Sequence, residues 1–179
     1  DDDWLHYYGD ANWESGMLTA AGYDQVDLLT RGTTPDGTNT AVGILNGGVS
    51  FAGYHGVPTG SNVGWNGFEI VADDLANGPM LPIVPVYTCQ TVLGWSEGGE
   101  KWVRAGEPGD LRGAVAYVGQ SISCSYCAHW RSAMRRGFWG LLLEDTAETE
   151  IVTFGAAVEA GRMGYYSEFL ATDQYVGSI

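Results

Sequence analysis

The sequence predicts an α/β fold, a three-layer sandwich in which helices flank both faces of a mostly parallel β-sheet. Apolar runs of strand length alternate with helical patterns along the chain. Two of these runs, residues 49–54 and 82–88, are almost continuously apolar, as are strands buried on both faces of a parallel sheet. The chain has 179 residues, 45% of them hydrophobic, which suffices for one globular core. We therefore predict a single domain over residues 1–179.

Glycine stops and apolar periodicity place the elements of the first half. In chain order, they are a helix at 12–21, a strand at 25–30, a helix at 38–45 and a strand at 49–54. The first helix is expected to end near Gly22 and the second at Asn46-Gly47-Gly48, because glycine readily adopts the backbone conformation that closes a helix. A turn-rich segment, RGTTPDGTN, separates the first strand from the second helix.

The second half continues the alternation and ends in two helices. The expected elements are a helix at 68–76, a strand at 83–88, a helix at 100–105, a strand at 113–118, and helices at 128–143 and 149–161. The helix at 128–143 is the best defined, because Trp130, Met134 and Phe138 recur in it at helical spacing. No repeat or linker indicates a second domain.

The charge of the chain excludes some partners. With 22 acidic and 8 basic residues, the formal net charge is −14, which argues against nucleic acid and anionic membranes. No segment has the roughly 20 apolar residues that a membrane span needs. An acidic, glycine-rich sequence whose only lysine is Lys101 is common among secreted proteins, so we expect a secreted or cell-surface location.

A histidine and a cysteine follow the two clearest strands. His55-Gly56 comes directly after residues 49–54, and Cys89 closes the run at 82–88. The 34 positions from His55 to Cys89 fit one crossover between neighbouring parallel strands, whose carboxyl ends meet at the same edge of a sheet. A thiol needs a base nearby to become a nucleophile, and a backbone N–H beside a glycine can stabilise the resulting oxyanion. The sequence therefore predicts a cysteine–histidine site at this edge.

The other two cysteines form a separate pair. Cys124 and Cys127 have C-x-x-C spacing, which allows a local disulfide, half of a metal site or two thiols. Zinc would need two further ligands, and only His129 lies nearby in the sequence, so we place the disulfide and thiol alternatives ahead of metal. Cys89 is left over, which is typical of a reactive thiol.

The order of these motifs resembles one family. The resemblance is carried by NGGVSFAGYHG at 46–56, Trp65 in the next loop, LPIVPVYTCQ at 81–90, RGAVAYVGQSI at 112–122 and MRRGFW at 134–139. Together they cover most of the chain from about Gly22 to Phe169 and are similar to the gingipain-type cysteine peptidases, which have a caspase-like fold.

This resemblance implies roles for five residues. His55 would be the general base or proton shuttle and Cys89 the nucleophile, while the backbone amides of Gly56 and Cys89 would form the oxyanion hole. Trp130 would wall the pocket for the substrate side chain before the scissile bond. Asp10 is the nearest match to the acidic residue that often gives this pocket a preference for basic side chains.

The resemblance also has departures. Tyr54 stands where the family usually has glycine, which predicts a large side chain beside the site. The chain is expected to lack the family's first and last strands, and an incomplete sheet predicts self-association through its edges. We expect no cofactor. Calcium is common in the family as a structural ion, but no EF-hand-like spacing is present.

Two main hypotheses follow. The first is a secreted cysteine endopeptidase that hydrolyses protein or peptide substrates. The second is a non-catalytic, caspase-like assembly subunit of an extracellular filament or surface protein. A third, less favoured, is the same dyad acting on a non-peptide acyl group. Thiol reactivity of Cys89 distinguishes the peptidase from the assembly subunit.

Overall fold

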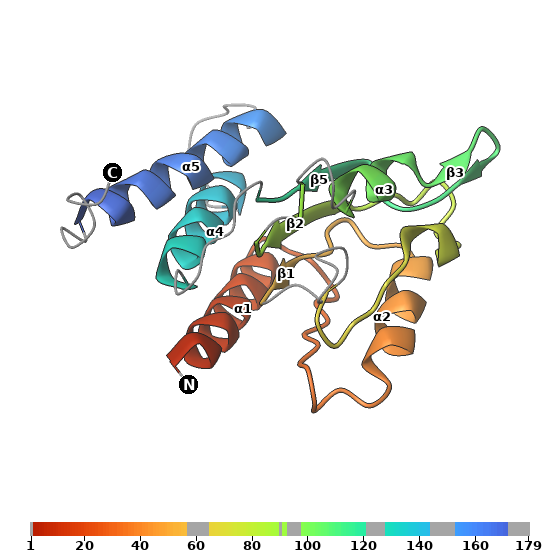
Figure 1. Ribbon diagram of the computed structural model, residues 1–179, viewed down its shortest axis with the longest axis horizontal. Helices are drawn as coiled ribbons and strands as arrows, with labels where there is room; N and C mark the ends of the chain where they lie inside the picture. The colour runs from red at the N-terminus through yellow and green to blue at the C-terminus, as the bar shows by residue number, and fades with distance from the viewer. Residues whose placement is uncertain are drawn as a thin grey trace. The chain divides into compact units, whose positions relative to one another are not determined.

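A computed structural model describes residues 2–56, 65–89, 91–92, 98–120, 128–143 and 153–171 (Figure 1). The contacts between residues divide the chain into two compact units, and each is described by itself. Unit 1 comprises Asp1–Leu28 and Ser125–Ile179, and unit 2 comprises Leu29–Cys124. The predicted cysteine and histidine both belong to unit 2.

In the part of unit 2 that the structure describes, three strands form a parallel sheet. The strands are β1 (Tyr54–His55), β2 (Ile83–Tyr87) and β5 (Ala116–Val118), in the order β1-β2-β5. An isolated parallel bridge between Phe51 and Ile83 continues the β1–β2 pairing upstream. The central strand β2 is the most buried, as its Val- and Ile-rich sequence predicts. The predicted mostly parallel sheet flanked by helices is confirmed.

The other described elements of unit 2 are two helices, a short 3-10 helix and a hairpin. They are α2 (Gly37–Asn46), η1 (Ala72–Asp74), α3 (Gly98–Arg104), and β3 (Gly106–Glu107) paired with β4 (Asp110–Leu111). The helices direct apolar side chains into one core, to which α2 contributes Leu45 and α3 contributes Trp102. The buried members of this core are Ala41, Leu45, Tyr54, Trp65, Phe68, Ile70, Ala72, Leu75, Val84, Val86, Trp102 and Ala114.

The described residues of unit 1 form three helices, α1 (Asp2–Ala20), α4 (Ala128–Leu143) and α5 (Phe154–Ala171). Glycines allow α4 and α5 to approach closely. A Cβ atom at Gly161 would lie 2.8 Å from the carbonyl oxygen of Met134, and one at Gly164 would lie 2.6 Å from that of Ala133. A Cβ atom at Gly137 would run into the backbone of Ala160. The two helices therefore pack backbone against backbone.

The structure differs from the sequence prediction at several elements. The helix α1 begins at Asp2 rather than at residue 12, β1 begins at Tyr54 rather than at residue 49, and α5 ends at Ala171 rather than at residue 161. Residues 25–30 form no strand, because they pair with no other strand among the residues described. Over the predicted helix at 68–76, only Ala72–Asp74 is helical. Here Phe68, Ile70 and Ala72 are buried, whereas the residues between them are exposed. This two-residue period belongs to an extended chain rather than to a helix.

The β3–β4 hairpin was not predicted at all. Its sequence, GEPGDL, contains the Pro-Gly dipeptide that marks turns, which was the available signal. Gly106 has φ 79° and Gly109 has φ 95°, in the region that favours glycine.

None of the helices within the described ranges combines the length and the hydropathy that a bilayer crossing demands.

Candidate active site

The structure places His55 and Cys89 at the carboxyl ends of neighbouring parallel strands. His55 is the last residue of β1 and lies opposite Tyr87, the last residue of β2. Cys89 follows Tyr87 by two residues, at the beginning of the turn that leaves the sheet, and it is a half-buried thiol. This edge of a parallel sheet is where α/β proteins place their catalytic and binding residues.

His55 and Tyr87 share one face of the sheet. Their rings meet edge to face, with centroids 6.2 Å apart and planes at 70°. Cys89 lies two residues beyond the last residue of β2, after a bend at Thr88, and so just past this edge of the sheet. We therefore expect the imidazole of His55 and the thiol of Cys89 to lie near one another at this edge.

Tyr54 projects to the opposite face, into the core. It is paired with Val86, and its ring stacks on Trp65 with centroids 5.2 Å apart and planes 6° apart. Its hydroxyl oxygen accepts a hydrogen bond from the backbone N–H of Asn66, 3.0 Å away. The large side chain that the sequence predicted beside the site therefore lies beneath the sheet, on the side away from His55.

Tyr54 also explains the glycine that follows the histidine. A Cβ atom at residue 56 would lie 2.7 Å from the hydroxyl oxygen of Tyr54 and 3.0 Å from its Cζ. The phenol end of Tyr54 thus packs directly against the backbone of Gly56. Any side chain at this position would displace it, so the tyrosine requires glycine at the position predicted to supply an oxyanion donor.

The stack continues across the underside of the sheet. Trp65 stacks on Trp102, with centroids 5.5 Å apart and planes 10° apart, and Trp102 contacts Tyr117 of β5 at 6.4 Å. Burial raises the pKa of Tyr117 to about 12, although hydrogen bonds with Thr91 and Trp65 lower it. Tyr117 therefore stays protonated at neutral pH and acts as a hydrogen-bonding core residue.

The turn after Cys89 is tied to two other segments. Thr91 is buried, and its side-chain oxygen accepts a hydrogen bond from the N–H of Gln120, beyond the end of β5. Its carbonyl oxygen accepts another from the N–H of Gly99 in the first turn of α3. Sequence reasoning did not identify Thr91. The available signal was a polar residue two positions after the predicted nucleophile, where the family often has small residues.

Comparison with known proteins decides the family. The sequence profile of Peptidase family C25 matches residues 6–177 of the chain. The chain belongs to peptidase family C25. The predicted gingipain-type membership is confirmed, and the chain is a protein of cysteine-peptidase type.

A solved structure supports the same fold. The chain is similar to the crystal structure of the Arg-specific cysteine proteinase gingipain R, with a TM-score of 0.76 and 21% sequence identity. The match covers 90% of this chain and 38% of that one, so the chain spans well under half the length of its solved relative. A comparison with curated proteins gave no significant match. The caspase-like α/β fold predicted for this C25 chain is confirmed.

Trp130, predicted to wall a substrate pocket, lies in the first turn of α4 in unit 1. Its half-buried ring contacts three aromatic side chains, those of His129 and of Tyr165 and Phe169 on α5. These contacts place Trp130 in the α4–α5 interface of the C25 chain. Its role toward a substrate stays a prediction.

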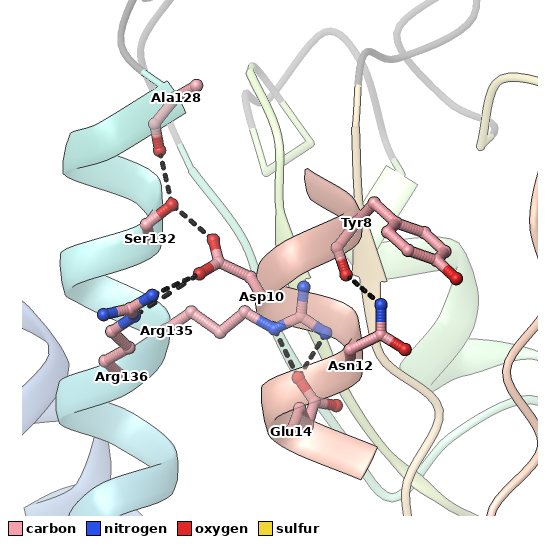
Figure 2. A network of polar contacts seen from close by, with 8 residues as sticks. All are labelled: Tyr8, Asp10, Asn12, Glu14, Ala128, Ser132, Arg135 and Arg136. Carbon is pink, nitrogen blue, oxygen red and sulfur yellow. Dashed lines mark hydrogen bonds and ion pairs between the residues drawn. The ribbon is translucent and has the colours of Figure 1, made fainter. Parts of the chain in front are cut away.

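Asp10, the second predicted substrate-binding residue, lies on α1, and its side chain is buried against α4 (Figure 2). Its carboxylate accepts a hydrogen bond from the hydroxyl of Ser132 and forms an ion pair with Arg136 at 3.2 Å. Four residues further along α1, Glu14 forms an ion pair with Arg135. These contacts give Asp10 a part in joining two helices, and its role toward a substrate stays a prediction.

Other parts of the site prediction concern metals and the remaining cysteines. Cys124 and Cys127 lie outside the described residues. Within the part of the C25 chain that the structure covers, no three His, Cys, Asp or Glu side chains come together as metal ligands.

Proposed function

We propose that the chain is the catalytic core of a secreted cysteine endopeptidase that uses His55 and Cys89. One observation supports the proposal: in a member of family C25, His55 ends one parallel strand and Cys89 follows the end of the neighbouring strand by two residues. A thiol and an imidazole so placed can exchange a proton. The thiol supplies the nucleophile and the imidazole the base, so the reaction needs no cofactor.

The first half of the proposed reaction forms an acyl-enzyme. His55 takes the proton of the Cys89 thiol, and the thiolate sulfur attacks the carbonyl carbon of the substrate peptide bond. The carbonyl oxygen becomes an oxyanion, which accepts hydrogen bonds from the backbone N–H groups of Gly56 and Cys89. The C–N bond then breaks, and the leaving amine takes the proton from His55.

The second half returns the enzyme to its starting state. Water attacks the thioester carbon and gives a proton to His55, and the same two N–H groups stabilise the second oxyanion. The C–S bond breaks to release a carboxylic acid, and the proton returns to the Cys89 sulfur. The proposed substrates are proteins or peptides. The net charge of −14 argues against nucleic acid or an anionic membrane as the partner. It supports the proposal that the enzyme meets its protein substrates outside the cell.

The rate of alkylation of Cys89 by iodoacetamide between pH 5 and 9 tests this function. The protein for the test carries Cys124→Ser and Cys127→Ser, which leaves Cys89 as its one cysteine. A peptide cysteine has a pKa of about 8.5 and reacts slowly at pH 6. We expect Cys89 to react at least about tenfold faster there, because the imidazole favours its thiolate.

The histidine variants make the test specific. His55→Ala should remove the rate advantage at pH 6, whereas His6→Ala, an exposed histidine of unit 1, should leave it unchanged. Cleavage of casein should be lost in Cys89→Ala and His55→Ala alike. A Cys89 no more reactive than a peptide thiol, together with no cleavage of casein, would refute the proposal and favour the assembly subunit.

A further inference from the structure

We propose that Thr91 is a positioning residue that holds the turn carrying Cys89 in place for catalysis. The inference rests on the proposed function of Cys89, but its structural part can be measured independently. The side chain of Thr91 touches neither His55 nor Cys89 in any contact described here. It acts on the turn that leaves β2, through its hydrogen bonds with Gln120 and Gly99.

Hydrogen bonds connect residues 91–92 to two segments distant in sequence. The Oγ1 atom of Thr91 accepts from the N–H of Gln120 at 3.2 Å, and its carbonyl oxygen accepts from the N–H of Gly99 at 2.8 Å. The N–H of Val92 donates to the carbonyl oxygen of Gln120 at 3.3 Å. The exchange between residues 91–92 and Gln120 resembles a short piece of strand pairing, with a threonine hydroxyl in place of one backbone carbonyl.

Burial makes the threonine hydroxyl necessary. Thr91 is only 1% exposed, and Gln120 is 8% exposed. Water therefore cannot replace the hydroxyl as acceptor for the Gln120 N–H, and a buried donor without an acceptor costs more than an average hydrogen bond contributes. An apolar residue of the same shape at position 91 would leave this N–H buried without that acceptor.

Two glycines are fitted to this turn. A Cβ atom at Gly119 would run into Oγ1 of Thr91 and would lie 2.8 Å from Cγ1 of Val92. A Cβ atom at Gly99 would lie 2.9 Å from the same Val92 atom and 2.7 Å from the ring of Tyr117. The ends of β5 and α3 can close onto the turn only because both positions lack side chains.

The position of Cys89 follows from these restraints. Up to Tyr87 the chain is fixed by its pairing with β1, and at Thr91 and Val92 it is fixed by Gln120 and Gly99. Cys89 lies midway between these two anchors. Loosening the second anchor would let the thiol drift from the imidazole, and a displacement of about 1 Å can lower a rate about a hundredfold.

Thr91→Val and Thr91→Ser provide a matched pair of variants. Valine keeps the branched shape and removes the acceptor, whereas serine keeps the acceptor and removes only a methyl group. Both are made in the Cys124→Ser, Cys127→Ser background. The measurements are the hydrogen exchange of the Gln120 amide, the alkylation rate of Cys89 by iodoacetamide from pH 5 to 9, and the melting temperature.

We expect Thr91→Val to speed exchange of the Gln120 amide about tenfold, as loss of one hydrogen bond implies. It should also reduce the alkylation rate at pH 6 about tenfold or more and shift the pH profile toward that of a peptide thiol. Thr91→Ser should restore both. A purely structural role would lower the melting temperature without changing the pH profile of the folded protein.

The outcomes separate this inference from the proposed function. If Cys89 is unreactive in the parent protein, the proposed function fails, and the exchange of Gln120 alone decides whether Thr91 anchors the turn. If the parent is reactive, an unchanged pH profile in folded Thr91→Val overturns the positioning role. Unchanged exchange of the Gln120 amide overturns the hydrogen bond itself.

Discussion

Unit 1 buries carboxylates that pair with arginines between its helices, whereas unit 2 buries stacked aromatic rings beneath a parallel sheet. In unit 1, the inward face of α1 carries Asp10 and Glu14, whose carboxylates meet α4. In unit 2, the buried layer beneath the sheet contains stacked aromatic rings, among them those of Trp65 and Trp102. Buried charges respond to pH and to loss of a partner, while stacked rings respond to loss of volume. The two units should therefore fail under different perturbations.

The largest expected effect is on the ion pair between Glu14 and Arg135. Arg135→Met keeps much of the side-chain length but leaves Glu14 buried without its partner, which should cost about 3–5 kcal/mol of unfolding free energy at pH 8. Urea unfolding monitored by tryptophan fluorescence measures the change. Arg162→Met is the matched control, because the pair of Arg162 with Glu159 is exposed. A loss in the control as large as that in Arg135→Met would contradict the comparison.

The pH dependence of this pair has a definite sign. Burial raises the pKa of Glu14 above its usual 4.5, and the charge of nearby Asp10 raises it further. Arg135 and a hydrogen bond from Trp139 lower this pKa, but burial has the larger effect. A carboxyl whose pKa is raised in the folded state contributes stability below pH 4.5, and this contribution is lost as the pH rises through the raised pKa. Arg135→Met should therefore be less destabilising at pH 5 than at pH 8. Equal losses at both values would show that Glu14 does not change charge between them.

In unit 2, the next largest effect should come from Tyr54. Tyr54→Ala removes a buried ring from the stack and should cost about 3 kcal/mol or more. Tyr54→Phe keeps the stack and removes only the acceptor for the Asn66 N–H, so it should cost about 1 kcal/mol. Neither loss should depend on pH between 5 and 8, in contrast to Arg135→Met. A pH-dependent loss in Tyr54→Ala would remove the contrast between the units.

A smaller effect is expected where α4 and α5 meet. Gly161→Ala places a methyl group 2.8 Å from the carbonyl oxygen of Met134 and should cost about 1–3 kcal/mol, although alanine favours a helix. Gly16→Ala in α1 is the control, since a Cβ atom there meets nothing within 4 Å, and it should be neutral or stabilising. Melting temperatures of the two variants measure the difference. Similar behaviour of both would contradict the close packing.

The elements that local patterns determine could be predicted from the sequence. The strand β2 and the helices α2 and α4 follow from an apolar run or from apolar periodicity, and the predicted bounds differ from the observed ones by one residue at most. The order of the strands also placed His55 and Cys89 at one sheet edge. These features depend on residues close together in the chain, which is why one sequence suffices to find them.

The features that were missed depend on distant partners. The helix α1 begins at Asp2 rather than at residue 12, and its buried face includes Asp10 and Glu14, which a search for apolar residues passes over. Their burial makes sense only with the arginines of α4, more than 120 residues away. Likewise, the role of Thr91 depends on Gln120, which no local pattern connects to it.

The stacked indoles of Trp65 and Trp102 give the protein an optical signature. Two indoles whose centroids lie 5.5 Å apart interact electronically, and we expect this coupling to split their far-ultraviolet circular dichroism into a band pair that isolated tryptophans lack. Because Trp65 also lies on Tyr54, the residue beneath Gly56, this band pair reports on the layer that supports the predicted oxyanion hole. The integrity of that layer can thus be followed in solution without a label, a substrate or an inhibitor.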